Sequence, residues 1–340
     1  MDQYELQIAN ALWVARSNPI REDFIKKIAN FYGTGAAIPA DFTGDPDGEC
    51  ERINTWIEEN TNGRIKGALA SSSIDELTRL IITNAIYFHG QWVDPFPKHS
   101  TEACDFFTAP GESSKVTTMR NTTQAGRYGA FEPDGTLFST PGYYDPDAPP
   151  KFYAGENGFA LYEMPYKGND LAMVILSPNS IDGLSAIEKD LTYAKLDAWI
   201  AKLQQRETDV SLPKFKTNTR YSLNKTLSDM GMESAFGEDA DFSGMTKNGE
   251  QLYPSEVLQQ AYISVDEEGT EAAAASIIEN QKCSNVYFIP EFRADRPFLF
   301  IIRDKRSGSI LFMGRIAHSR SSRRFVYPSS TRERTGHPSL

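Results

Sequence analysis

The stretch VDEEGTEAAAAS, residues 265–276, has three consecutive acids and a glycine shortly before four consecutive alanines. Local propensity favours a helix here, because alanine is the best helix former, Thr270 could cap the helix and Glu271 suits its first turn. However, the residues that follow, ENQKCSN, close no amphipathic face, so such a helix would bury little. The stretch also continues the apolar run LQQAYISV, which is typical of a strand.

An alternative is that this stretch enters a β-sheet as a new strand. Side chains alternate along a strand, so one face would carry the small or apolar uncharged set Thr270, Ala272, Ala274, Ser276 and Ile278. The opposite face would carry Glu271, Ala273, Ala275, Ile277 and Glu279. If the segment entered between two strands, the uncharged set could be buried without leaving an ionised group buried and unpaired. Alanine has a weak strand propensity, which would keep the segment out of the sheet until insertion is triggered.

Helical and strand patterns alternate along the rest of the chain. Apolar residues at helical spacing predict short helices in REDFIKKIANFYG and CERINTWIEENTNGRI, a longer helix in IDGLSAIEKDLTYAKLDAWIAKLQQ, and one in SLNKTLSDMG that ends at Gly231. The run TRLIITNAIYFHGQW predicts a strand that is covered on both faces. Two hairpins are predicted to turn at residues 167–170 and 304–308. This mixed order predicts an α+β fold with a large mixed β-sheet.

Composition narrows the class of partner. The chain has 340 residues, of which 40% are hydrophobic and 24% charged, and a formal net charge of −11. Nucleic acids and anionic membranes bind basic surfaces, so neither is expected as a partner. No apolar run approaches the ~20 residues that a membrane-spanning helix needs. The first residues, MDQYELQIANALWV, do not show the pattern of a signal peptide.

Patterns of catalysis and of cofactor binding are missing from the sequence. It contains no G-x-S-x-G elbow, Walker loop, H-E-x-x-H, paired C-x-x-C or G-x-G-x-x-G. Three cysteines, Cys50, Cys104 and Cys283, lie far apart without the spacing of a metal site or of a disulfide framework. We therefore expect no enzyme activity, no cofactor and no metal.

Two segments depart from the alternating pattern. Residues 132–158 are dense in Pro, Gly and Asp, which predicts a surface insertion. Residues 319–340 carry five arginines against one glutamate and little apolar periodicity, which predicts a disordered basic tail. Residues 1–318, which include this insertion, are predicted to form one domain.

Three stretches together resemble the serpin family of protease inhibitors. They are the EEGTEAAAAS segment, the strand NAIYFHGQWVDPF and the ending FRADRPFLFIIRDKRSGSILFMGRI, and they occur in the family's order. The similarity extends from about Leu6 to Ile316 and includes LPKF at residues 212–215. It implies a fold of one large and several smaller β-sheets packed with helices, and an exposed reactive-centre loop.

The resemblance implies a mechanism in which the protein is a suicide substrate. A target serine, and sometimes cysteine, protease cleaves the loop, and the freed loop then inserts as a strand into the large sheet. Residues 266–290 would form the hinge and loop, with the hinge at Glu267, Glu268, Gly269, Thr270, Glu271, Ala272, Ala273, Ala274 and Ala275. The family's usual loop length places the reactive bond between Cys283 and Ser284, with Lys282 as the neighbouring alternative.

Four further residues match positions that control loop insertion in the family. Trp92 matches the buried tryptophan where the loop begins to insert, and Lys214 matches the partner of Glu267 in a charge pair. Asn84 matches the polar cluster under the centre of the sheet. Gln259 stands where many serpins have a histidine, and its amide can both donate and accept hydrogen bonds in that cluster.

The chain also departs from the family at its start. The family's first helices have no counterpart here, and one of them runs beneath the main sheet, so the inner face of that sheet is expected to lose apolar cover. Three hypotheses follow: an inhibitory serpin, a non-inhibitory serpin-fold binding protein, and an inactive fragment. The resemblance further implies an extracellular monomer.

Overall fold

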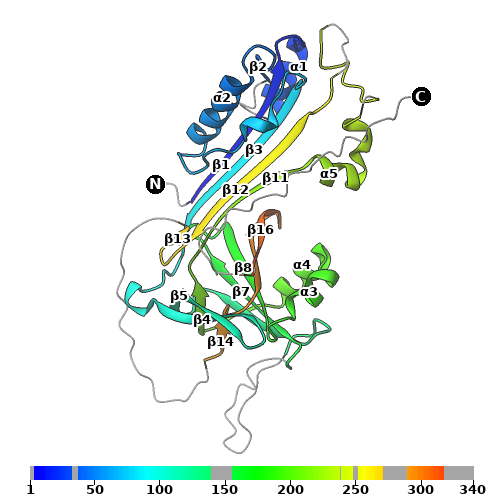
Figure 1. The fold of residues 1–340 in the computed structure, drawn as a ribbon. Helices are drawn as coiled ribbons and strands as arrows, with labels where there is room; N and C mark the ends of the chain where they lie inside the picture. Colours follow the sequence, from blue (N-terminus) through cyan, green and yellow to red (C-terminus); the bar gives the residue numbers. More distant parts are fainter. Residues whose placement is uncertain are drawn as a thin grey trace, which may run out of the picture.

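Three β-sheets make up most of the fold (Figure 1). The structure is a computed structural model, and it describes residues 4–32, 37–138, 155–237, 239–247, 252–270 and 289–317. The long sheet has the strand order β11-β12-β3-β1-β2, and the short β13 pairs with β3. Its strands are β1 (Tyr4–Ala15), β2 (Ala37–Ala40), β3 (Leu80–Gln91), β11 (Phe215–Ser222), β12 (Glu256–Val265) and β13 (Gly269–Thr270).

The other two sheets lie beyond one end of the long sheet (Figure 1). The four-stranded sheet has the order β14-β10-β5-β4, and the second six-stranded sheet has the order β16-β15-β8-β7-β6-β9. The four-stranded sheet consists of β4 (Glu102–Ala109), β5 (Glu112–Thr123), β10 (Thr208–Pro213) and β14 (Glu291–Arg293). The second six-stranded sheet consists of β6 (Arg127–Phe131), β7 (Phe159–Pro165), β8 (Leu171–Pro178), β9 (Gln204–Gln205), β15 (Phe298–Asp304) and β16 (Ile310–Ile316).

The α-helices lie where the sequence predicts them, with one correction. They are α1 (Glu22–Tyr32), α2 (Pro46–Glu59), α3 (Leu184–Asp190), α4 (Tyr193–Ala201) and α5 (Asn224–Leu227). The single long helix predicted over residues 181–205 is wrong, because Leu191 and Thr192 are extended and Thr192 caps α4 through the amide of Lys195. Short helical turns complete the set: η1 (Ser71–Ser73), η2 (Lys98–Ser100), η3 (Ser228–Met232) and η4 (Glu233–Ala235). Gly231, at φ 102°, lies inside η3.

Helix α2 covers one face of the long sheet. Its Ile53 and Ile57 are buried against Trp13 of β1 and Ile81 of β3. Trp13 is fully buried, and its indole Nε1 donates to Thr83 Oγ1 at 3.0 Å. Asp45 caps α2 by accepting from the amide of Gly48. This face therefore has a continuous apolar core.

The opposite face of the long sheet is less well covered. On β3 the alternate residues Ile82, Asn84 and Ile86 are only half-buried, and Ile8 of β1 is 53% exposed. The prediction that the β3 stretch is covered on both faces is therefore wrong for its middle section, because α2 packs against the other set of side chains. Toward the end of β3, Phe88 returns to full burial in the core shared with the other two sheets.

The two predicted hairpins are confirmed and form the centre of the second six-stranded sheet. β7 pairs antiparallel with β8, and β15 pairs antiparallel with both β16 and β8. Gly168 and Asn169 have positive φ in the first turn, and Gly308 does in the second. Helices α3 and α4 cover one face of this sheet, where Trp199 packs against Phe131 and Phe159. The observed architecture is the predicted α+β fold.

We predict that Ile53→Ala destabilises the protein by ~2–5 kcal/mol, because it removes a fully buried side chain between α2 and the long sheet. Ile25→Ala in α1 is the matched control, since Ile25 is 37% exposed, and it should cost well under half as much. The midpoint of urea unfolding measures both. Equal costs would contradict the packing described for α2.

Candidate functional site

A tight turn reverses the chain at the end of β12. We call residues 266–269 the hinge turn. The Asp266 amide donates to Gly269 O at 2.8 Å, and the Gly269 amide donates back to Asp266 O at 3.3 Å. Gly269 has φ 143°, and a Cβ atom there would lie 2.1 Å from Gly90 O. Only glycine fits this position, because any side chain would collide with the backbone of β3.

The hinge turn directs the chain into the gap between β3 and β12. These two strands run parallel and pair from Ile81 with Glu256 to Tyr87 with Tyr262. Past that point they no longer pair, and β13 takes the place beside β3, with Gly269 opposite Gln91 and Thr270 opposite Gly90. β13 runs antiparallel to β3 and therefore heads toward the middle of the long sheet.

The segment after β3 holds the hinge turn by its backbone. The amides of Trp92 and Phe96 donate to Glu268 O at 2.9 Å and to Glu267 O at 2.7 Å. The indole Nε1 of Trp92 donates to Asp266 O at 3.1 Å. Trp92 is 1% exposed and stacks on Tyr166 at a centroid distance of 4.5 Å. The structure thus places the predicted Trp92 directly against the predicted hinge.

Two ion pairs fix the acids of the hinge turn. Lys214 Nζ lies 2.7 Å from Glu267 Oε2, which is the pair that the sequence comparison with the family implied. Thr101 Oγ1 donates to the other oxygen, Oε1, at 3.0 Å. Lys98 Nζ lies 2.7 Å from Glu268 Oε1. Sequence reasoning missed Lys98 and Thr101, because both lie about 170 residues from the hinge turn and belong to no recognisable motif.

Neighbouring acids of the hinge turn have pKa values that shift in opposite directions. Partial burial works to raise the pKa of Glu267, but the hydrogen bonds from Lys214 and Thr101 outweigh it and hold that pKa below its ordinary value. Burial raises the pKa of Asp266, and its hydrogen bond from the Glu268 amide only partly offsets this. Glu267 is therefore the acid whose negative charge the site stabilises.

The predicted polar residues of the sheet centre are brought together. Asn84 of β3 and Gln259 of β12 lie directly opposite each other in the parallel pair. Asn84 Nδ2 donates to Asn10 Oδ1 on β1, with the two atoms 2.5 Å apart. Sequence reasoning did not find Asn10, which lies opposite Asn84 in the β1–β3 register. Polar side chains of three adjacent strands thus cross the middle of the long sheet.

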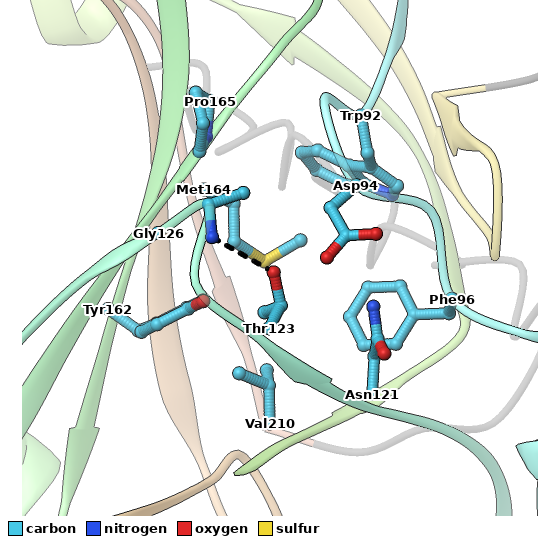
Figure 2. Close-up of a pocket in the computed structure, with 11 residues that line it drawn as sticks. Trp92, Asp94, Phe96, Asn121, Thr123, Gly126, Tyr162, Met164, Pro165 and Val210 are labelled. Atoms are coloured by element: carbon cyan, nitrogen blue, oxygen red, sulfur yellow. Dashed lines mark hydrogen bonds between the residues drawn. The ribbon is translucent and has the colours of Figure 1, made fainter. Parts of the chain in front are cut away.

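A small cavity lies beside Trp92 (Figure 2). Its volume of about 10 Å³ leaves room for about one water molecule. The hydroxyl end of Tyr162 points into it, and burial together with the nearby Asp94 carboxylate raises the pKa of that phenol. Phe96 forms another wall. The cavity is too small for an organic ligand, and Trp92, Asp94 and Phe96 of the segment that holds the hinge turn form part of its wall.

Several predicted residues lie outside the part of the chain that the structure describes. They are the hinge residues Glu271 to Ala275, the reactive-bond residues Lys282, Cys283 and Ser284, the middle of the predicted insertion at 139–154, and the basic tail at 319–340. Among the described residues, no cluster of three or more His, Cys, Asp or Glu side chains is arranged to hold a metal ion. No described helix is long and apolar enough to cross a membrane.

We predict that Lys214→Met costs about 1–2 kcal/mol of stability, because it leaves the Glu267 carboxylate, 9% exposed, with only its Thr101 partner. This is below the ~3–5 kcal/mol typical of breaking a fully buried pair, since the Lys214 side chain is 37% exposed. Lys225→Met is the matched control, because Lys225 (84% exposed) and its partner Asp229 (63% exposed) are both in water, which predicts a change within experimental error. A thermal melt compares them, and similar losses for both variants would count against a special role for Lys214.

The pH dependence of stability should report on Glu267. Because its folded-state pKa lies below the ordinary value of 4.5, its contribution is fully present above about pH 4.5 and is lost as the pH falls through the folded pKa. The melting temperature of Glu267→Gln should therefore lie below that of the wild type at pH 7, and the difference should shrink on acidification. A difference that stays constant from pH 7 to pH 3.5 would show that the charge of Glu267 is not what stabilises the turn.

Comparisons with known proteins agree with this geometry. The profile of the family described as Serpin (serine protease inhibitor) matches residues 1–319. Human serpin B4 is 37% identical over 319 residues, which cover 93% of this chain and 75% of serpin B4. A serpin-like protein of Methanosarcina acetivorans is 35% identical over 322 residues, which cover 93% of this chain and 68% of that protein.

Solved structures show the same fold. Uncleaved ovalbumin superposes with a TM-score of 0.77 at 27% identity, covering 94% of this chain and 75% of ovalbumin. Serpin48 of the insect Tenebrio molitor superposes with a TM-score of 0.76 at 30% identity, covering 94% of this chain and 77% of Serpin48. The resemblance and the fold class predicted from the sequence are both confirmed, and the chain belongs to the serpin family.

Proposed function

We propose that this protein inhibits serine proteases as a suicide substrate. The observation that carries the proposal is β13, the two-residue strand that already pairs with β3 in the gap between β3 and β12. Because β3 and β12 are parallel, a strand that extends β13 would run antiparallel to both of its neighbours. In the proposed mechanism β13 is the start of the inserted strand.

The register of β13 supports insertion over the full length of β3. Continued without a bulge, the pairing of Thr270 with Gly90 would bring Ser276 opposite Asn84 and Asn280 opposite Leu80, the first residue of β3. The inserted strand would then run from Gly269 to Asn280. The proposed reactive bond, Cys283–Ser284, lies just beyond its end.

Side-chain chemistry supports the same register. Directly opposite residues of a strand pair share a face, so the uncharged set from Thr270 to Ile278 would share the face of Ile86 and Phe88. Ser276 would lie between Asn84 and Gln259, where its hydroxyl could join the polar cluster of the sheet centre. The uncharged face would meet apolar and amide groups. On the other face Glu271 would lie opposite the partly exposed His89, and Glu279 opposite the buried Ile81 near the start of β3.

Insertion supplies the driving force of the proposed mechanism. The protease serine attacks the carbonyl carbon of Cys283, the bond to the Ser284 nitrogen breaks, and an acyl-enzyme forms. A dozen residues then gain ladder hydrogen bonds at a net ~1 kcal/mol each, which gives a driving force of order 10 kcal/mol. In this mechanism each molecule of the protein is consumed in a single reaction, and the protein is not itself an enzyme. We propose a monomer that acts outside the cell on a serine, or in some cases cysteine, protease.

A panel of serine proteases tests the proposal. Each enzyme is incubated with the protein, and the products are separated on a denaturing gel and identified by mass spectrometry. We expect an SDS-stable complex with at least one protease, and a single early cut between Lys282 and Asn285. The cleaved protein should also melt at a much higher temperature, because insertion releases the free energy stored in the uncut state.

We predict that Thr270→Arg abolishes the complex without slowing loop cleavage. Gly90, opposite Thr270, lies where an added Cβ would meet side-chain atoms of Phe88 and Tyr166 at 2.8 Å, so this face has no room for a guanidinium. Insertion would bury that charge without a partner. Glu271→Arg is the matched control, because alternation places residue 271 on the opposite face, and it should keep the complex.

Two outcomes would overturn the inhibitory proposal. Cleavage in the loop with neither a covalent complex nor a rise in melting temperature would favour a non-inhibitory serpin-fold binding protein. Equal effects of Thr270→Arg and Glu271→Arg would show that the predicted faces of the inserted strand are wrong.

A further inference from the structure

A polar cavity lies on the second six-stranded sheet, apart from the hinge turn. Its volume is about 200 Å³, many times the ~10–15 Å³ that holds one water molecule. Charged side chains from three strands, one helix and one turn line it: Arg127, Glu163, Arg303, Asp197 and Lys305. Three of these groups are cationic and two anionic, so the lining is net positive in a chain whose formal charge is −11.

Arg303 is an arginine at a position where the strand pattern is apolar. Along β15, Leu299 and Ile301 point toward the core under α3 and α4, and alternation places residue 303 on the same face. Arg303 is 9% exposed. A guanidinium is strongly polar and always charged, so its burial here costs free energy unless its donors are paired.

The partners of Arg303 leave part of that cost uncompensated. Its Nη2 lies 3.5 Å from Asp197 Oδ1, which is a long contact to a side chain that is 56% exposed. Its Nε is buried and makes no hydrogen bond to the part of the chain that the structure describes. Nε and one Nη of an arginine form the edge that binds carboxylate, sulfate or phosphate oxygens in pairs.

The remaining charges of the cavity do not cancel this cation. Glu163 is already held by two bonds from Arg127, at 2.8 and 2.7 Å, so that pair is close to neutral. Lys305 Nζ donates to the neutral amide oxygen of Asn169 at 2.6 Å, which leaves its charge in place. Arg303 and Lys305 together therefore outweigh the water-exposed Asp197.

We propose that this cavity is a binding site for a small oxyanion, held by the Nε edge of Arg303 with Lys305 at the rim. The chemistry fits the tetrahedral oxygens of inorganic phosphate or sulfate, whether free or carried on a sugar. Binding to the folded state stabilises it by mass action. The site is independent of loop insertion, so it can be tested whether or not the protein inhibits a protease.

Calorimetric titration of the whole protein with inorganic phosphate and with sulfate, at constant ionic strength against sodium chloride, tests the site. We expect saturable binding of one ion per chain and a higher melting temperature. Arg303→Met should weaken phosphate binding at least tenfold, and Arg303→Lys should weaken it less, because lysine keeps the charge but loses the paired edge. Arg315→Met is the matched control on the neighbouring β16, where Arg315 pairs with Glu188 at the surface. The affinity of this variant for phosphate should stay within twofold of the wild-type value.

A second variant and a second ligand complete the test. If Arg303→Met does not fold, Lys305→Met at the rim should still fold and weaken binding about threefold. A sulfated disaccharide that binds more tightly than free sulfate, again through Arg303, would identify the anion as one carried on a sugar. No saturable binding by the wild type would overturn the proposal, as would equal losses in Arg303→Met and Arg315→Met, which would indicate only general attraction of anions.

Discussion

The structure depends on the unfinished pairing between two parallel strands, β3 and β12. Over seven residues they are hydrogen-bonded neighbours, and beyond Tyr87 and Tyr262 they separate. Parallel strands cannot be joined by a short hairpin, but a strand antiparallel to both can be placed between them. The hinge turn is the device that reverses the chain at that point. Everything else at the site, from Gly269 to Trp92, holds this turn against the end of β3.

The hinge turn combines rigid support with polar partners that can be exchanged. Backbone amides of the segment after β3 hold its carbonyls, and the stacked rings of Trp92 and Tyr166 leave that segment little freedom. The carboxylates of Glu267 and Glu268, in contrast, are held by lysine side chains that remain in contact with water. Breaking such partly exposed pairs costs less than breaking buried ones, which suits a turn that is proposed to move.

The two faces of the long sheet are built differently. One face is sealed by α2 with Trp13 and Ile53 at its centre. The other is half-open around Asn84, where amides of neighbouring strands meet and Ile8 is exposed. A sheet whose strands must separate gains from a middle section in which polar contacts replace apolar interlocking, because hydrogen bonds can reform with a new strand while a close-packed core must be broken.

The sequence by itself determined the elements with strong local signals and the family. The hairpins around β7–β8 and β15–β16, helix α2 and the α+β class follow from periodicity and turn residues, and the Gly269 segment identified the serpin resemblance. Only the tertiary structure showed that Lys98 and Thr101 hold the hinge turn and that Arg303 lies in a cavity. Periodicity reports which face of one element is apolar. Contacts between residues 100 or more positions apart depend on how the sheets pack, and no local pattern records that packing.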